Sequence, residues 1–204
     1  MSHAFASIAF TPAVKAAQVR EGSRASYARG FEGGETFNQA LGPDERAFVA
    51  AQRSACLATV SETGWPYVQH RGGPVGFLKV IDDRTIAFAD YAGNRQLVSA
   101  GNLAGNDRVA MILVDYANRA RLKVLGHASI RDVAANDAAL AGFVDPAYPA
   151  RPQRIVTIRV EGFDWNCSKH IPVRFEAEDV QRALDERDAL IASLRARLTT
   201  RDSA

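Results

Sequence analysis

The chain has 204 residues, of which 47% are hydrophobic, and a formal net charge of +2 at pH 7. This length and apolar content predict one globular domain with its own core, together with terminal extensions. The near balance of charge excludes the strong positive field of a nucleic-acid-binding or membrane-surface protein, and no apolar run is long enough to cross a bilayer.

Residues 1–43 predict an N-terminal arm of mixed character. The segment AVKAAQVREG predicts a short helix that ends at Gly22, and the rest of the arm shows no strong hydrophobic period. The first residues lack the basic stretch and the continuous apolar segment of a signal peptide. We therefore expect a cytoplasmic protein.

Residues 44–175 predict the central domain, which is rich in short strands. A helix, DERAFVAAQR, opens it, with Asp44 as the expected N-cap or first-turn acid. The apolar runs that follow are separated by Gly, Pro and Asp turns, which favours antiparallel strands over βαβ units. A short helix, NDAALAGF, is expected before the last strand. The expected strands are SACLATVS, WPYVQHR, GFLKVID, RTIAFAD, RVAMILVD, ARLKVLGHASIRD and RIVTIRVEGF.

Residues 176–204 predict a charged C-terminal helix. Its apolar residues follow spacings of 4, 7, 3 and 4, and Arg187 fills the gap in that series: Val180, Leu184, Ile191, Leu194 and Leu198. Such spacing is typical of a short heptad seam. Two interpretations remain open: the helix lies along its own domain, or it contacts a second copy of the chain.

The two cysteines, Cys56 and Cys167, lie far apart and form no paired CxxC motif. The sequence therefore predicts neither a disulfide framework nor a zinc site, and we expect no bound metal. Cys56 lies in the apolar run ACLATV, which is typical of a small core residue. Cys167 and His170 have the spacing of half a metal site, but no second half is present.

The stretch from Ala89 to Asn106, ADYAGNRQLVSAGNLAGN, passes from a strand through a turn into a helix. The N-terminus of a helix presents free N–H groups and a positive dipole, which suits a phosphate group. Arg95, expected one turn into this helix, adds a guanidinium, and further hydrogen-bonding side chains come from Asn94, Gln96 and Ser99. Ordinary helix capping explains Asn and Ser equally well, so the stretch alone leaves both interpretations open.

Further cations lie on the strands expected nearby. Lys79 belongs to GFLKVID, and Arg119, Arg121 and Lys123 alternate along NRARLKVLG, which gives one face of that strand a cationic stripe. A solvated strand face is one interpretation. The other is that these cations converge with Arg95 on one phosphate.

Two other stretches combine unusual residues. In QHRGGPVGF, two glycines before a proline allow close approach of a flat ligand to the backbone, and Arg71 precedes them. His70 in the same stretch is typical of a structural histidine. In WNCSKHIP, an aromatic side chain, a thiol, a cation and a histidine follow the last strand.

With these residues assembled, the sequence resembles the pyridoxamine 5'-phosphate oxidase-like superfamily of FMN-binding split barrels, over roughly residues 45–175. The segments that carry the resemblance are GFLKVIDDRTIAFADYAGNRQ, NDRVAMILVDY and RARLKVLGHASI. The segments GWPYVQHRGGPVGFLK and NCSKHIP are most similar to an uncharacterised bacterial branch of that superfamily. The resemblance implies a mainly β fold: a six-stranded antiparallel split barrel with flanking helices and a C-terminal helix. It also implies a homodimer with two FMN molecules at the subunit interface.

The resemblance also implies site residues. Lys79 matches the strand lysine of the family and Arg95 its phosphate-binding arginine, while Gln96 and Arg121 fall where the oxidases have a second cation and a glutamine. Trp165 resembles a late tryptophan that reaches FMN from the other chain, with Lys169 or Arg174 as its partner. Arg71 has no clean counterpart in the family and is included for its chemistry alone. The expected cofactor-binding set is Arg71, Lys79, Ala89, Asp90, Asn94, Arg95, Gln96, Ser99, Arg121, Trp165 and Lys169. The sequence does not identify a catalytic residue.

The sequence departs from the true oxidases after the last strand. Those enzymes hold the substrate phosphate with a C-terminal arginine-x-histidine segment, whereas CSKHIPVRF here leads into a charged helix. The resemblance therefore implies an FMN-dependent oxidoreductase with an unknown small-molecule substrate, not a true pyridoxamine phosphate oxidase. The alternatives are a non-catalytic flavin-binding or storage protein, and a haem- or deazaflavin-binding relative on the same fold.

Overall fold

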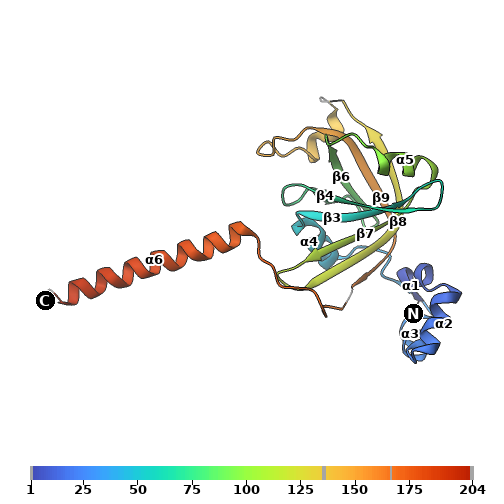
Figure 1. Ribbon diagram of the computed structural model, residues 1–204, viewed down its shortest axis with the longest axis horizontal. Coiled ribbons are helices and arrows are strands. Elements are labelled where there is room, and N and C mark those ends of the chain that lie inside the picture. Colours follow the sequence, from blue (N-terminus) through green and yellow to red (C-terminus); the bar gives the residue numbers. More distant parts are fainter. Residues whose placement is uncertain (1, 135–136, 166, 203–204) are drawn as a thin grey trace. The chain divides into compact units, whose positions relative to one another are not determined.

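The structure is a computed structural model that describes residues 2–134, 137–165 and 167–202. The chain divides into two compact units: residues 1–115 with 121–167, and residues 116–120 with 168–204. The first unit holds the sheet and the N-terminal arm, and the second holds the C-terminal helix (Figure 1).

The first unit is built on an antiparallel sheet. Over the described residues this sheet has seven strands in the order β4-β3-β7-β8-β9-β6-β5. They correspond to the seven apolar runs expected as strands, one more than the six strands that the resemblance implied. The antiparallel, mainly β fold with flanking helices is confirmed. The strands are β3 (Ser54–Val60), β4 (Pro66–Gly72), β5 (Leu78–Val80), β6 (Thr85–Tyr91), β7 (Arg108–Asp115), β8 (Ala120–Asp132) and β9 (Pro152–Trp165).

The core lies on the inner side of this sheet, which curls around it (Figure 1). Along β3 buried and partly exposed residues alternate, because successive strand residues point to opposite faces. The largest fully buried side chains include Leu57, Phe88, Met111, Leu122 and Ile158, which come from five different strands. Cys56 does not belong to this core: it is partly exposed on the outer face of β3, between buried Ala55 and Leu57.

Helix α4 (Pro43–Ala51) precedes the sheet, and α5 (Val98–Gly105) follows β6. Gly42 is the N-cap of α4, and its N–H donates to the Glu45 carboxylate at 2.9 Å, so Asp44 is a first-turn acid rather than the cap. A 3₁₀-helix, η1 (Ala138–Gly142), stands where a short α-helix was expected to begin at Asn136, a residue outside the described ones.

The N-terminal arm is more ordered than its sequence pattern indicates. The predicted helix is α2 (Pro12–Arg20), but α1 (Ala4–Ala9) and α3 (Arg24–Phe31) were not predicted. Strand β1 (Ser2–His3) pairs in parallel with β2 (Thr36–Phe37). The ring of His3, which is 2% exposed, lies 4.4 Å from Phe31 and 4.7 Å from Phe37, centroid to centroid. Contacts across the arm, rather than a local period, therefore hold these short helices.

The predicted C-terminal helix is confirmed as α6 (Ala177–Asp202), and residues 203 and 204 lie outside the described ones. In the same unit, the Arg174 guanidinium lies over the Tyr116 ring at 4.9 Å, and Arg119 donates to the Ser168 carbonyl. The domain boundaries at 43/44 and 175/176 stay predictions.

Candidate functional site

The turn between β6 and α5 has an unusual backbone. Arg95 and Leu97 have φ angles of 60° and 57°, in the left-handed region that residues with a side chain seldom adopt. Leu97 is the N-cap of α5 and makes no side-chain capping bond. Arg95 was expected inside the first helical turn, but it precedes the helix. Ordinary capping therefore does not explain this stretch, because Asn94 accepts from the Gln96 N–H two residues later, outside the helix.

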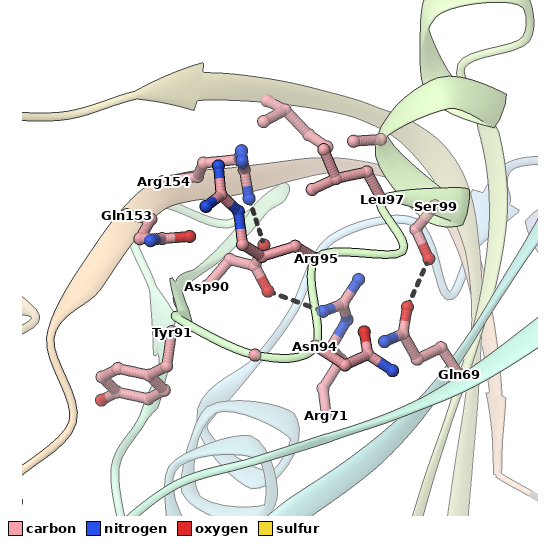
Figure 2. Close-up of a pocket in the computed structure, with 13 residues that line it drawn as sticks. Gln69, Arg71, Asp90, Tyr91, Asn94, Arg95, Leu97, Ser99, Gln153 and Arg154 are labelled. Atoms are coloured by element: carbon pink, nitrogen blue, oxygen red, sulfur yellow. Dashed lines mark hydrogen bonds and ion pairs between the residues drawn. The ribbon is translucent and has the colours of Figure 1, made fainter.

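A cavity of about 50 Å³ opens beside this turn (Figure 2). Its walls come from β4, the end of β6, the turn, the start of α5, β8 and the start of β9. The polar side chains that line it are Gln69, Arg71, Asp90, Tyr91, Asn94, Arg95, Ser99, Gln153 and Arg154. The fold thus brings together five of the residues predicted from the sequence: Arg71, Asp90, Asn94, Arg95 and Ser99.

Arginines dominate the charge of this cavity. Arg71 donates from Nη1 to Asp90 Oδ1 at 2.6 Å, and Arg154 donates to Asp90 Oδ2 at 3.5 Å. Arg95 is the third guanidinium of the lining, against a single lining carboxylate. Arg154 is held from outside the cavity as well, because its Nε lies 2.9 Å from an oxygen of Asp132. The cavity therefore carries a net positive charge and suits an anion.

One of the arginines that line this cavity has a buried nitrogen without a hydrogen bond. Among the described residues, Arg71 Nε is buried and has no hydrogen-bond partner. A buried donor without an acceptor costs about 1–3 kcal/mol, so an acceptor in the cavity would recover that free energy. Ser99, which is 2% exposed, donates its hydroxyl to Gln69 at 2.9 Å and so orients that carboxamide at the cavity wall.

A second cavity, of about 140 Å³, shares Arg71, Asp90 and Tyr91 with the first. His70, Gly72 and Ala89 also line it, and burial raises the pKa of the Tyr91 phenol above its ordinary value. The neighbouring glycine pair was expected to open the backbone to a flat ligand. The structure gives Gly73 a different reason, because a Cβ there would lie 2.7 Å from the Phe77 Cβ.

Six of the predicted residues do not line the first cavity: Ala89 lines the second one, and Lys79, Gln96, Arg121, Trp165 and Lys169 line neither. Lys79 lies on β5 opposite Ala87, and its Nζ is 3.7 Å from where a Cβ on Gly76 would stand. It therefore lies at the α4 side of the barrel, beside the Ala50 carbonyl that approaches the same glycine. Gln96 is exposed in the turn.

Arg121 and Trp165 lie at the opposite end of the long strands. Leu122 of β8 pairs with Trp165 of β9, whereas Asp132 pairs with Arg154 beside the cavity. Strands rise about 3.3 Å per residue, so the two ends are about 30 Å apart along β8. The structure does not bring Arg121 or Trp165 to the cavity of their own chain.

At that far end, each side chain already has a fixed position. The Trp165 indole donates to Glu45 at 2.6 Å, and its ring lies 4.8 Å from that of Phe48. Arg121 donates from Nη2 to the Cys167 carbonyl, while its Nε is buried without a hydrogen-bond partner within the described ranges. Lys169 belongs to the second compact unit, whereas the cavity residues belong to the first.

The cavity lining also includes three residues that were not predicted from the sequence: Arg154, Gln69 and Gln153. Arg154 is the third residue of β9 and pairs with Asp90, 64 residues earlier, in the β6–β9 ladder. In the sequence it was only the first residue of an expected apolar strand, and its role becomes visible only once the pairing of the two strands is known.

Residues 41–163 match the family described as pyridoxamine 5'-phosphate oxidase. The chain belongs to that family. The match covers every strand of the large sheet except the last two residues of β9, and it includes all residues that line the first cavity. No curated protein matches the chain.

Similar solved structures carry varied names. HupZ of Group A Streptococcus is 18% identical, with 60% of this chain and 91% of that chain covered and a TM-score of 0.46. An FMN-binding protein from Syntrophomonas wolfei is 14% identical, with 74% and 97% covered and a TM-score of 0.47. General Stress Protein 26 from Bacillus anthracis is 17% identical, with 58% and 88% covered and a TM-score of 0.44.

Two further findings bear on the kind of site. Across the ranges that the structure describes, no helix has the length and apolar character needed to span a membrane. The same ranges contain no group of three or more His, Cys, Asp or Glu side chains placed to hold a metal ion.

Proposed function

We propose that the protein is a flavoprotein that binds FMN, acts as an oxidoreductase on a small molecule, and works as a homodimer with the flavin at the subunit interface. The observation that carries this proposal is the arginine-lined cavity at the β6–α5 turn, in a chain that belongs to the pyridoxamine 5'-phosphate oxidase family.

The phosphate of FMN fits the charge and donors of this cavity. Arg71, Arg95 and Arg154 supply guanidinium donors, and the buried Arg71 Nε needs an acceptor. The uncapped N–H groups at the start of α5 point from the same turn that carries Arg95. Each charge-assisted hydrogen bond contributes about 1.5–3 kcal/mol, so this set is sufficient for tight binding of a dianion.

The rest of the flavin would extend into the second cavity, which shares three lining residues with the first. There Ala89 and Gly72 offer little side-chain bulk, and the neutral Tyr91 phenol offers a hydrogen-bond donor. When bound, the flavin supplies the redox chemistry, and the chain supplies binding, orientation and electrostatics. No side chain of the chain has to act as a nucleophile.

A second copy of the chain is part of this proposal. The outer face of β3, β4, β7 and β8 contains a depression of about 220 Å³ with an apolar lining that includes Cys56, Ala58, Val68 and Ile112. Val68 is 61% exposed, which is costly for a large apolar side chain unless another surface covers it. We propose that this face is the dimer contact and that Trp165, Arg121 and Lys169 reach the flavin bound by the other copy. In this proposal Lys79 does not bind the phosphate; it packs at the α4 side of the barrel.

The substrate is proposed to differ from pyridoxamine phosphate, because the sequence lacks the oxidases' C-terminal arginine-x-histidine segment. Incubation with pyridoxamine phosphate under air should yield no pyridoxal phosphate above the protein-free background. Robust turnover would contradict this part of the proposal.

Titration of the apo-protein with FMN tests the site. Arg95→Ala should weaken binding at least about tenfold. The matched control is Arg159→Ala, since Arg159 lies on β9 but is 70% exposed and outside the cavity. Equal dissociation constants for Arg95→Ala and the unmodified protein would refute the assignment. The absorption spectrum of the purified protein separates flavin from deazaflavin and haem.

A further inference from the structure

Helix α6 has a row of apolar side chains that is exposed to solvent. Every residue from 177 to 199 is exposed, including the five apolar residues of the seam, which retain between 37% and 58% of their accessible surface: Val180, Leu184, Ile191, Leu194 and Leu198. Leu190, 59% exposed, flanks the seam and widens it. Helices gain most of their stability by packing an apolar face against another surface, so we expect the apolar face of α6 to bind one.

The seam has the geometry of a two-helix contact. From Val180 to Leu198 its positions alternate between steps of four and three residues when Arg187 is included, which keeps them on one side of the helix. At a rise of about 1.5 Å per residue, this stretch is about 27 Å long. Figure 1 draws α6 as one uninterrupted helix, so no kink breaks the seam.

Charge is distributed unevenly along α6. The first half carries a surplus of carboxylates, even after its two intrahelical ion pairs, Arg182 with Asp179 at 3.1 Å and Arg187 with Asp188 at 2.9 Å. Between residues 189 and 199 the charged residues are Arg195 and Arg197, with no carboxylate. One half of the helix is therefore acidic and the other basic.

These two patterns select one arrangement of two copies. In an antiparallel pair, the acidic half of one helix lies beside the basic half of the other. The seam also matches itself in that direction: Val180 meets Leu198 of the second copy, Leu184 meets Leu194, and Arg187 meets Ile191. A parallel pair would instead place Arg187 against its own copy and like-charged halves together, which is unfavourable.

We propose that α6 binds α6 of a second copy of this chain as an antiparallel pair. The contact is separate from the apolar face of β3, β4, β7 and β8, and it requires no flavin. Fewer than three heptads give a weak contact on their own, so other links between the copies would strengthen it by raising the effective concentration.

Cysteine cross-linking in the full-length chain tests the direction of pairing. The native cysteines are first replaced as Cys56→Ala and Cys167→Ala. Leu184→Cys and Leu194→Cys chains with tags of different size are then mixed and oxidised mildly. The proposal predicts 184–194 cross-links in several-fold excess over 184–184 and 194–194. Predominance of the like pairs, or no cross-link in any pairing, would overturn it.

A second pair of cysteine variants and a control variant show whether a low cross-linking yield comes from the choice of positions or from loss of the helix. Val180→Cys mixed with Leu198→Cys repeats the test in the outer layer, and circular dichroism reports whether α6 remains helical. Ala189→Cys places the thiol on the side of the helix opposite the seam and should cross-link poorly. The 184–194 yield should be the same with and without added FMN, so this result is independent of flavin binding.

Discussion

The two ends of the long strands β8 and β9 differ in the charge of their side chains and in the contacts that these side chains make. At one end, Arg71 and Arg154 form ion pairs with Asp90 in the first cavity. Arg95 also lines this cavity, so its net charge is positive. At the other end, the Trp165 indole donates a hydrogen bond to Glu45 at 2.6 Å, which holds the ring within its own chain. Yet each end has an arginine with a buried Nε that lacks a hydrogen bond among the described residues, Arg71 and Arg121.

We propose that each end is half of a site. The cavity end has three arginines, and the far end has a guanidinium and an indole that is 38% exposed and hydrogen-bonded to Glu45. One chain cannot join the two ends, because about 30 Å of strand separates them. In this proposal two copies of the chain join them.

The largest effect is expected at the cavity end. Arg154→Ala removes a guanidinium that contacts Asp90 and should weaken FMN binding roughly 10- to 100-fold. Equilibrium titration measures the dissociation constant, with Arg159→Ala on the same strand as the control. A dissociation constant unchanged by Arg154→Ala would remove this arginine from the site.

A smaller effect is expected from the far end. Trp165→Ala should weaken FMN binding about tenfold, because stacking of an aromatic side chain on a flat ring contributes about 1–3 kcal/mol. The other tryptophan, Trp65, is 75% exposed between β3 and β4 and serves as the control. Equal affinities for Trp165→Ala and Trp65→Ala would separate the far end from the flavin.

Within the cavity end, a neutral contact should matter less than a charged one. Ser99→Ala removes the hydroxyl that donates to Gln69 and should weaken FMN binding about threefold. Ser129→Ala, on an exposed position of β8, is the matched control. A loss as large as that of Arg154→Ala would contradict the view that charge dominates this cavity.

The N-terminal arm supplies a prediction about stability rather than affinity. Burial lowers the pKa of His3, against the opposing effect of Asp164 at 3.3 Å, and Lys123 lowers it further. The unfolded chain therefore binds the proton more readily than the folded one. The contribution of His3 to stability should be complete above its ordinary pKa, decline as the pH falls through about 6.5, and level off below the folded pKa.

Urea unfolding at several pH values checks this sign. His3→Gln should flatten the decline between about pH 7.5 and 5.5, whereas His127→Gln, at an exposed site beside Asp107, should keep it. A decline identical in His3→Gln and the unmodified chain would show that other groups cause it.

Much of the sheet was predictable because strand alternation leaves a period of two in the sequence. RVAMILVD and ARLKVLGHASIRD were predicted with the same ends as β7 and β8. Helices α1 and α3 were not predicted, because they are short and their aromatic residues contact His3 and Phe37 rather than follow a local pattern. The strand around Lys79 proved shorter than expected, at Leu78–Val80.

The candidate site was predictable only where its residues are close in sequence. Asp90, Asn94, Arg95 and Ser99 lie within ten residues, so one stretch contained them. Arg154 was missed, because its contact with Asp90 depends on long-range strand pairing. The unusual backbone at Arg95 and Leu97 was also missed, because neither residue type favours a positive φ.

The most direct test of the shared site is a mixed dimer. Arg95→Ala and Trp165→Ala chains with different tags are co-expressed, the heterodimer of about 44 kDa, twice the 22.1 kDa chain, is isolated, and FMN binding is titrated. If each site joins the cavity of one chain to Trp165 of the other, one site carries both substitutions and the other carries none. The result that we predict is one FMN per dimer bound with the affinity of the unmodified protein. Two weakened sites and no site of unmodified affinity would contradict the shared-site proposal.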